Sequence, residues 1–499
     1  MAEISGKASV RSAEAVTTNG DYRGERDDSL KAHFRFLWLT ILASCALIEY
    51  GFDQGIIGSF QAMVGFLKVF GYEDPRVPSG WNIAPVTIMI VTTSMGVLYF
   101  SRLLMGYGNG LVMAFTMVYI SELAPTKLRG LSYGLTSGWI TIGTAVGQLI
   151  ANSTEAIDSK LCYQIPLYVL YAMPVISIAS LPFLPESPRW LLLKGKEEQA
   201  LKSLTWVRNG AYDALALQSE FEEMRLNALH DLEQQSKWLV LDLFRGTNLR
   251  RTLLSVSVGL INPGTGAMFV LAFGTYFFKV IGIADPFKWS VVFHWLGVAG
   301  LFCSWYAIGR FGRRTLLLAG IIACGLSMLF LGVLFSLPAS AQNKSAMSAG
   351  VIFLFSWFIF WFNLGLAPTT YLTAGELPAQ NLRAYTAGLS TGTGFVFAWL
   401  TTFTTPYFIN PAELNWGGKY GYIWFGSTIL IAVVIYFVLP EVKGRSLEEI
   451  EEMFDARLPA KDFPKYVSRN VEVARQQAEK DLFGAEKAGV IHVEAASRV

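Results

Sequence analysis

The stretch Glu122–Arg129 has the sequence ELAPTKLR, and it recurs 254 residues later as ELPAQNLR at Glu376–Arg383 (376 − 122 = 254). A second pair is in nearly the same register, because Pro185 and Pro440 each open a Pro-Glu step 255 residues apart. All of these motifs follow long apolar runs. Two copies of one unit, pointing in the same direction along the chain, therefore organise the protein, and a site between such copies is the arrangement to expect.

The composition places these copies in a membrane. Of 499 residues, 53% are hydrophobic and only 16% are charged, against about 25% charged residues in soluble proteins. The apolar runs have roughly the length that a helix needs to cross the ~30 Å core of a bilayer. We therefore predict an all-α membrane protein and exclude a soluble enzyme. A formal charge of +2 offers no basic surface, so no nucleic-acid partner is expected.

Ten apolar runs are long enough to span as helices. They are 36–58, 103–123, 133–151, 164–184, 252–278, 291–308, 315–337, 349–374, 385–409 and 421–439. An eleventh run, 83–100, is at the lower limit of length and begins at Ala84-Pro85. With both termini and the central linker inside the cell, an even number of spans must precede Lys127. We therefore expect the eleventh run not to cross, since otherwise the N-terminus would face outside.

Polarity divides the chain into five parts. The first 30 residues lack the apolar core of a cleaved signal peptide, so we expect the first span to direct insertion. The only N-x-S/T sequons, at Asn152 and Asn343, are predicted to lie in loops opposite the basic linker. The predicted parts are a cytoplasmic N-terminal tail (1–35), an incomplete N-terminal helical bundle (36–184), a cytoplasmic linker (185–251), a C-terminal six-helix bundle (252–440) and a cytoplasmic C-terminal tail (441–499).

The same offset of 254 residues indicates that one span is missing from the first half. The second half carries GRFGRR at Gly309–Arg314 between two spans, yet 254 residues earlier nothing resembles it. The first span of the second half ends 98 residues before Glu376 (376 − 278), whereas that of the first half ends 64 residues before Glu122 (122 − 58). The first half is therefore short of about one span and its loop.

The first span holds two acids, Glu49 and Asp53, four residues apart and hence on one helix face. A charge at membrane depth costs about 2.5–3.5 kcal/mol on insertion scales, so a carboxylate there is neutralised or finds a cation. Arg102, beside the run 103–123, is the available cation. We predict that Asp53 and Arg102 carry proton coupling, with Glu49 as the weaker candidate. The alternative is that Asp53 only caps a helix end.

Charges also mark the ends of the spans next to the linker. Pairs of Glu122 with Arg129 and of Glu376 with Arg383 could hold one conformer closed until a rearrangement breaks them. The alternatives are local pairs that never open and, for the GRFGRR turn, positive charge that only sets topology. The predicted gating residues are Glu122, Arg129, Arg310, Arg313, Arg314, Glu376 and Arg383.

Polar and aromatic side chains inside the spans suit a polyhydroxylated ligand, because amides bind hydroxyl groups and an aromatic plate covers an apolar sugar face. The alternative is a hydrogen bond to a neighbouring helix, which is also our interpretation of His294, and we expect glycines such as Gly106 and Gly143 to serve packing. The predicted substrate-binding residues are Gln148, Asn262, Thr265, Asn363, Tyr371 and Trp399. The sequence has no catalytic set, phosphate loop or metal-ligand spacing, so we expect neither cofactor nor metal.

Together these motifs resemble the sugar porter family of the major facilitator superfamily, in particular its fungal branch. The resemblance implies twelve spans in two bundles and alternating access, with Asp53 and Arg102 matching the family's proton-coupling pair. Tyr371 stands where a Trp is usual, and the family's second span is missing between Asn82 and Val86. The stretches that carry the resemblance are YGFDQG (50–55), RLLMGYGNG (102–110), ELAPTKLRG (122–130), PESPRWL (185–191), GRFGRR (309–314), ELPAQNLR (376–383) and PEVKGRSLEEI (440–450).

The predicted function is accordingly a plasma-membrane transporter that moves a mono- or disaccharide together with a proton across the lipid bilayer by alternating access. Two alternatives stay open. One is a non-transporting sugar sensor, for which the tail offers mainly a capping box at Ser446–Glu449 that opens an amphipathic helix. The other is an inactive product of a transporter gene that has lost one span.

Overall fold

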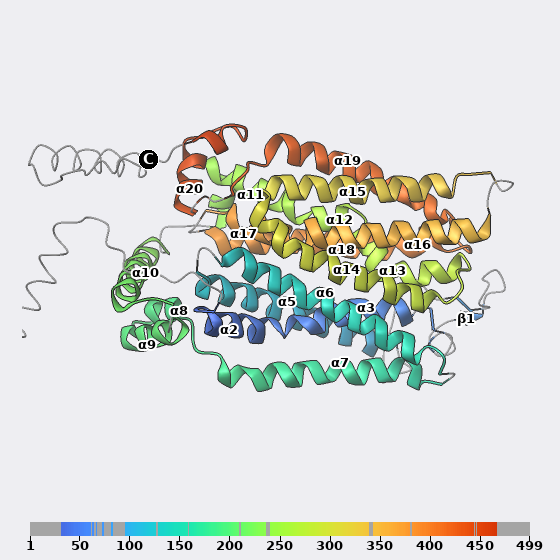
Figure 1. The fold of residues 1–499 in the computed structure, drawn as a ribbon, viewed down its shortest axis with the longest axis horizontal. Coiled ribbons are helices and arrows are strands. Elements are labelled where there is room, and N and C mark those ends of the chain that lie inside the picture. Colours follow the sequence, from blue (N-terminus) through green and yellow to red (C-terminus); the bar gives the residue numbers. More distant parts are fainter. Residues whose placement is uncertain are drawn as a thin grey trace, which may run out of the picture.

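Long helices lie side by side along one direction in the computed structural model, with the first half of the chain on one side and the second half on the other (Figure 1). The structure describes residues 31–466 apart from 61, 64–65, 67–71, 74–80, 83–94, 126–127, 158, 209–210, 236–239, 339–342, 380–381, 444 and 446. Each long helix satisfies its backbone N–H and C=O groups with hydrogen bonds inside the helix, which is the condition for crossing lipid.

The first half supplies four helical columns among the described residues. The first column bends by 41° between α2 and α3. A two-residue antiparallel ladder joins β1 (Tyr72–Glu73) to β2 (Trp81–Asn82). The helices are α2 (Phe34–Ser44), α3 (Leu47–Phe60), α5 (Met95–Leu123), α6 (Arg129–Thr154) and α7 (Leu161–Ser180).

The second half supplies six columns, two of which are broken. Gly266, with φ of 81°, separates α12 from α13, and a single π-helical turn, η4 (Phe362–Leu366), separates α16 from α17. The helices are α11 (Gly246–Gly259), α12 (Ile261–Gly264), α13 (Ala267–Val280), α14 (Pro286–Arg310), α15 (Arg313–Leu334), α16 (Lys344–Trp361), α17 (Ala367–Glu376), α18 (Arg383–Ile409) and α19 (Gly421–Val438).

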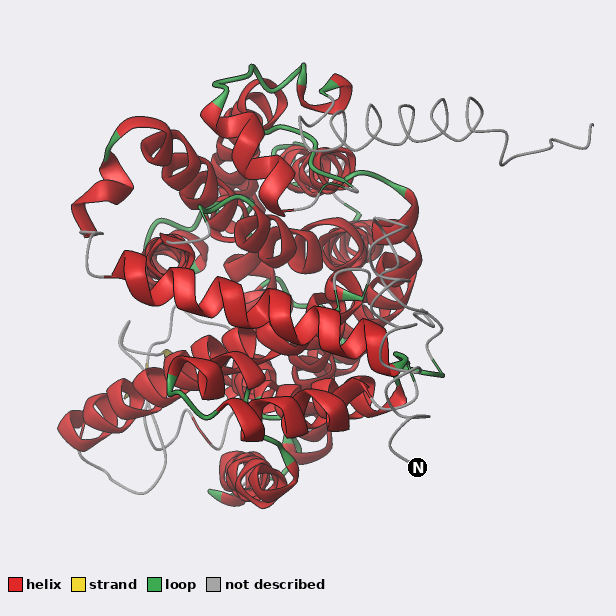
Figure 2. Cartoon of the chain, turned by 90° about the vertical axis from the view of Figure 1, so that its left-hand side faces the viewer, coloured by secondary structure: helices red, strands yellow, loops and turns green. Residues whose placement is uncertain are grey.

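The helices that are not part of these columns gather at one end of the molecule, which we call the linker end. It lies on the left in Figure 1 and faces the viewer in Figure 2. Its helices are α8 (Pro188–Leu193), α9 (Glu197–Arg208), α10 (Ala214–Gln235) and α20 (Leu447–Asp455). The remaining described elements are the single turns η1 (Leu181–Phe183), η2 (Val240–Phe244), η6 (Gly417–Tyr420) and η7 (Phe463–Lys465).

Six of the described helical segments are long and apolar enough to cross a bilayer, or seven if α2 and α3 form one bent span. Three of the ten predicted spans fall outside this number, namely the runs 133–151, 252–278 and 385–409, although each has a helical column in the structure. The run 252–278 is broken into α11, α12 and α13. The other two correspond to α6 and α18, which are long enough but rich in Thr, Ser and Gly.

Two other expectations need correction. Met95–Phe100, the end of the run predicted not to cross, forms the first turns of α5 and continues the next predicted span, whereas residues 83–94 lie outside the described residues. Asn152 lies in the last turn of α6 rather than in a loop. Asn343 is the N-cap of α16.

Glycines bring α3 into backbone contact with both halves. A Cβ on Gly51 would lie 1.9 Å from the carbonyl oxygen of Ile140 in α6, and one on Gly55 would lie 2.5 Å from that of Thr144. A Cβ on Gly58 would lie 1.8 Å from the carbonyl oxygen of Ala272 in α13, in the other half. Small residues permit such close approach of helices in membranes. These glycines therefore fix α3 between α6 and α13.

The glycines of α5 do not pack as predicted. A Cβ at Gly106, Gly108 or Gly110 would have nothing within 4 Å among the described residues. The large side chains beside them, Leu103 and Tyr107, are each 67% exposed. This face of α5 therefore has no helix against it in the described part of the chain.

We predict that Gly51→Ala destabilises the protein by about 1–3 kcal/mol, because the added methyl group overlaps the backbone of α6. Thermal unfolding of the purified protein in detergent measures the effect. Gly106→Ala is the matched control and should not lower the midpoint, since the new methyl group meets nothing within 4 Å. Equal midpoints for both variants would contradict the backbone contact between α3 and α6.

Candidate binding site between the halves

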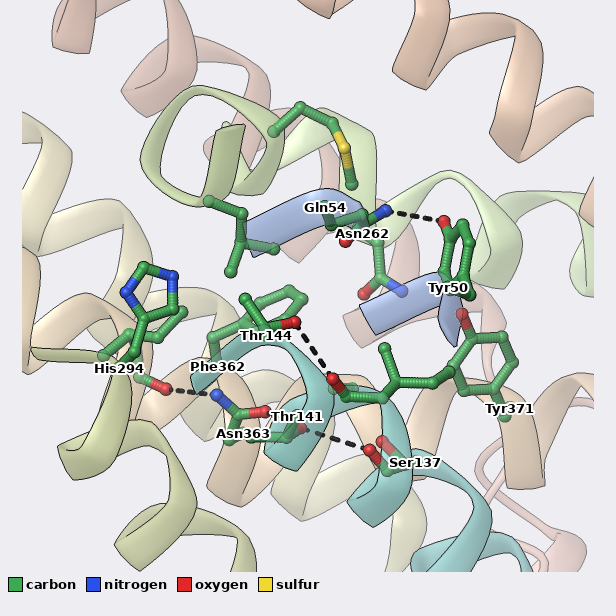
Figure 3. Close-up of a pocket in the computed structure, with 15 residues that line it drawn as sticks. Tyr50, Gln54, Ser137, Thr141, Thr144, Asn262, His294, Phe362, Asn363 and Tyr371 are labelled. Atoms are coloured by element: carbon green, nitrogen blue, oxygen red, sulfur yellow. Dashed lines mark hydrogen bonds between the residues drawn. The ribbon is translucent and has the colours of Figure 1, made fainter. Parts of the chain in front are cut away.

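A central pocket lies between the two halves and is lined by both (Figure 3). It has about 600 Å³ of empty space, including the part that opens to solvent. Its lining residues are Tyr50 and Gln54 of α3, Ser137, Ile140, Thr141 and Thr144 of α6, Asn262 of α12, Met268 and Leu271 of α13, His294 of α14, Ile359 of α16, Phe362 and Asn363 of η4, and Ala367 and Tyr371 of α17.

The described wall of this pocket has hydroxyl, amide and imidazole groups but no acidic side chain, Lys or Arg. Apolar side chains such as Leu271 and Phe362 complete it. A charged ligand would leave water without gaining a counter-charge from this wall, which is costly. The pocket therefore suits a neutral ligand with both polar and apolar faces.

Hydrogen bonds hold the wall in place and join the halves. Thr141 of α6 donates its hydroxyl hydrogen to Oδ1 of Asn363 at 2.8 Å, and Nδ2 of Asn363 donates to the carbonyl oxygen of Ile359 at 3.0 Å. Nε2 of Gln54 donates to the hydroxyl of Tyr50 at 2.7 Å. Asn363 lies in the π-helical turn, and Pro368, which has no N–H to give to residue 364, follows it.

The structure brings three of the six predicted substrate residues, Asn262, Asn363 and Tyr371, into the pocket wall. Tyr50 and Gln54 were missed, although their spacing of four residues places them on one helix face. The same signal was available for Ser137, Thr141 and Thr144, which are spaced i, i+4 and i+7 along α6.

Gln148, Thr265 and Trp399 lie elsewhere. Gln148 is buried, accepts from Ser59 Oγ at 2.8 Å and donates to the carbonyl oxygen of Gly55 at 2.6 Å. Thr265 is buried, and its hydroxyl donates to the carbonyl oxygen of Asn262 at 3.1 Å. Trp399 is 63% exposed on α18 and stacks on Phe403 with ring centres 5.7 Å apart.

Of the predicted proton-coupling pair, Asp53 is buried on α3, with 8% of its surface exposed. Glu49 lies one turn earlier and is half-buried. Arg102 lies in α5, but its side chain is outside the described part of the structure. The pairing of Asp53 with Arg102 therefore stays a prediction.

Among the predicted gating residues, Arg313 and Glu376 form an ion pair. Nη2 of Arg313 is 3.1 Å from Oε1 of Glu376, and Nε is 3.3 Å from Oε2. The two side chains are only 16% and 13% exposed. A bidentate pair of this kind is stronger than a single contact. It ties the start of α15 to the end of α17 at the linker end.

The GRFGRR turn also contacts the PEVKGR motif. The carboxylate of Glu441 accepts hydrogen bonds from the backbone N–H groups of Arg313 and Arg314, each at 3.0 Å. The positive end of the α15 dipole favours this carboxylate. A Cβ on Gly312 would lie 2.1 Å from Oε2 of Glu441, which explains the glycine at this position.

The other gating residues make different contacts. Nη1 of Arg310 donates to the hydroxyl of Tyr306 at 3.0 Å, and Nη2 of Arg314 donates to the carbonyl oxygen of Tyr436. Glu122 accepts from the hydroxyl of Ser187. Arg383 begins α18, and the side chain of Arg129 lies outside the described residues. The pairs Glu122–Arg129 and Glu376–Arg383 stay predictions.

Two arginines that were not predicted cap the same point of the repeat. Arg208 of α9 donates to the carbonyl oxygen of Leu123 at 2.9 Å, and Arg251 of α11 donates to that of Leu377 at 3.0 Å. The two carbonyls are 254 residues apart (377 − 123). Both carbonyl groups belong to the residue after the repeated glutamate, so the start of each copy of the motif contacts a buried guanidinium.

Two helical halves with repeated motifs at one end and an uncharged pocket between them define a membrane transporter of the major facilitator type. The chain belongs to the family described as Sugar (and other) transporter, whose sequence model matches residues 82–454. Its relatives are transporters rather than enzymes.

Curated relatives include fungal transporters. The major facilitator-type transporter ecdD of Aspergillus rugulosus is 28% identical over 419 residues, covering 82% of this chain and 76% of that protein. The general alpha-glucoside permease of Saccharomyces cerevisiae is 28% identical over 489 residues, covering 86% and 77%. Both support the predicted resemblance to the fungal branch.

Among solved structures, the proton:xylose symporter XylE bound to 6-bromo-6-deoxy-D-glucose superposes with a TM-score of 0.61. The two chains are 18% identical, and the match covers 85% of this chain and 87% of that one. This likeness confirms the predicted major facilitator fold, and the chain is a multi-pass membrane protein.

For the ion pair at the linker end, we predict that Arg313→Ala and Glu376→Gln each lower the thermal stability. The double variant should lose less than the sum of the two losses, by about 0.5–3 kcal/mol, because the partners share one interaction. Arg310→Ala combined with Glu376→Gln is the control and should be additive. Additive losses for Arg313 and Glu376 would show that the two side chains do not pair in solution.

Proposed function

We propose that this protein binds a neutral sugar in the central pocket, and that a form of the chain with the missing span restored carries the sugar across the membrane by alternating access. The observation that carries the proposal is the wall of the pocket, which both halves build from hydroxyl, amide and aromatic groups without a formal charge. Sugars offer hydroxyl groups to the hydroxyl and amide groups of the wall, and an apolar ring face to its aromatic groups. Relatives named as an alpha-glucoside permease and a low-affinity glucose transporter support the same class of substrate.

The contacts on either side of the pocket support alternating access. At the linker end, Gly134 of α6 packs against Trp305 of α14, whose Cδ1 would be 3.0 Å from an added Cβ. At the opposite end, Nζ of Lys279 donates to the carbonyl oxygen of Ala62 across the halves. A ligand in the pocket reaches one side of the membrane only when one of these contact sets opens. The plasma membrane is the proposed location, as is usual for sugar porters.

The charge of the ligand gives the direct test. The full-length protein should bind D-glucose at least about tenfold more tightly than D-glucuronate at neutral pH, since that ratio needs only about 1.4 kcal/mol and the carboxylate finds no cation in the described wall. Displacement of bound radiolabelled D-glucose by unlabelled D-glucose and by D-glucuronate measures the ratio of the two affinities. The two ligands share one ring, so size is controlled. Tighter binding of D-glucuronate would contradict a neutral substrate.

We further propose that Asp53, paired with Arg102, couples transport to protons. The burial of Asp53 beside the α3–α6 contact supports this role, because a buried carboxylate must be paired or protonated. The structural neighbour named as a proton:xylose symporter adds support through its title.

Asp53→Asn should keep the exchange of sugar across the membrane but abolish its accumulation, because an amide cannot cycle a proton. Uptake of radiolabelled sugar with and without a protonophore measures both, in a form of the chain that carries the missing span. Glu49→Gln is the matched control and should still accumulate sugar. Accumulation by Asp53→Asn equal to that of the parent would remove Asp53 from the coupling role.

The missing span is supported by the internal repeat. Gly134 and Gly138 of α6 pack against Trp305 and Leu301 of α14. Adding 254 to each gives Gly388 and Gly392 of α18, where a Cβ would have nothing within 4 Å among the described residues. The helix that α18 lacks corresponds by symmetry to α14, the second column of its half. We therefore propose that the first half has lost its second span.

We predict that the unmodified chain transports poorly or not at all, and that inserting a span equivalent to α14 after Asn82 raises its unfolding midpoint and restores uptake. The exposed face of α18 would then be covered. Thermal unfolding and uptake of radiolabelled sugar, compared between the two forms, measure this. Robust uptake by the unmodified chain would contradict the loss of function.

A further inference from the structure

We propose that Nε2 of His294 accepts a hydrogen bond from one hydroxyl of the bound sugar and thereby helps to select the substrate. The inference rests on the proposed sugar site and assigns a new residue to it. His294 lies on α14, lines the pocket and is 3% exposed (Figure 3). Its sequence context had suggested only helix packing.

The hydrogen bond on the other ring nitrogen sets the tautomer. Nδ1 of His294 lies 2.8 Å from the carbonyl oxygen of Ser290. A carbonyl oxygen only accepts, so Nδ1 must carry a hydrogen. In the neutral ring, Nε2 is then a bare acceptor. This buried Nε2 has no hydrogen-bond partner among the described residues.

A second acceptor in the same wall is also unsatisfied. Oδ1 of Asn262 is buried, lines the pocket and has no partner in the described part of the chain. Two donors of the α6 wall are used within the protein, since Thr141 donates to Asn363 and Thr144 donates to the carbonyl oxygen of Ile140. An unsatisfied buried acceptor is costly. A ligand that brings donors would satisfy both acceptors, and a sugar hydroxyl is such a donor.

His294 also stands close to the contact that joins the halves. Gly297 lies three residues further along α14 and shares its face with His294. A Cβ on Gly297 would lie 2.8 Å from Nδ2 of Asn363, and Asn363 accepts from Thr141 of the other half. A ligand hydroxyl on Nε2 therefore binds within a turn of the inter-half hydrogen bond. A metal role has no support, because the described residues include no group of three His, Cys, Asp or Glu that could hold an ion.

Binding to the full-length protein in lipid nanodiscs tests this assignment. The probes are D-glucose, D-xylose and maltose, followed by the single-deoxy forms of the tightest binder. His294→Phe keeps a flat ring but removes the acceptor, so it should weaken binding of the parent sugar by about threefold to tenfold. For the one deoxy sugar that lacks the recognised hydroxyl, the variant and the wild type should bind equally.

Two further variants separate recognition from packing. His294→Gln retains an acceptor and should recover part of the lost affinity. Leu271→Val alters the apolar wall and should change the affinity for all analogues by a similar factor. A uniform loss across analogues with His294→Phe, or no loss, would overturn the role of His294 and leave the sugar site standing. If the wild type binds none of the three sugars, the proposed function fails and this inference fails with it.

Discussion

The structure depends on the backbone contact of α3 with α6 and α13. A side chain larger than hydrogen at Gly51, Gly55 or Gly58 would overlap a carbonyl oxygen, so glycine is the only residue that permits the observed distance. This contact presents Tyr50 and Gln54 to the pocket. It also brings Ser59 within 2.8 Å of Gln148, to which its hydroxyl donates a hydrogen bond.

The internal repeat also explains how the helices at the linker end are attached to the two halves. The carbonyls of Leu123 and Leu377 occupy equivalent positions and each receives a guanidinium, from Arg208 and Arg251. Each guanidinium also has an acidic partner outside the spans, with Glu220 at 3.0 Å and Glu451 at 3.9 Å. The same chemistry therefore fastens the linker helices to the first half and the C-terminal helix α20 to the second half.

Sequence predicted those features that follow from local pattern. The repeated motifs, the two helical halves and the pocket residues Asn262, Asn363 and Tyr371 were accessible because polar groups inside apolar runs are conspicuous. Sequence could not show which face of α18 is turned toward the other helices. Trp399 is exposed although it lies in an equally apolar run. The helices α6 and α18 each form a long column at a predicted span, although their Thr, Ser and Gly make them less apolar than the other spans.

Pairing across the fold was the hardest to predict. The predicted pair of Glu376 with Arg383 stays a prediction, and the structure shows a bidentate partner of Glu376 that sequence did not suggest, Arg313, which comes 63 residues earlier in the chain. Likewise, the proposed role of His294 depends on Ser290 occupying one ring nitrogen while the other has no hydrogen-bond partner among the described residues, and only the tertiary structure shows this. Residues that act through tertiary contacts leave little signal in a single sequence.

The most direct measurement of the central claim is an experimental structure of the full-length protein in nanodiscs with D-glucose at high concentration. The account predicts density for one sugar between Tyr50 of the first half and Asn363 of the second, with ring hydroxyls within hydrogen-bond distance of the pocket wall. Sugar density at another place, with this pocket filled by the protein's own side chains, would contradict the claim that the two halves together form the binding site.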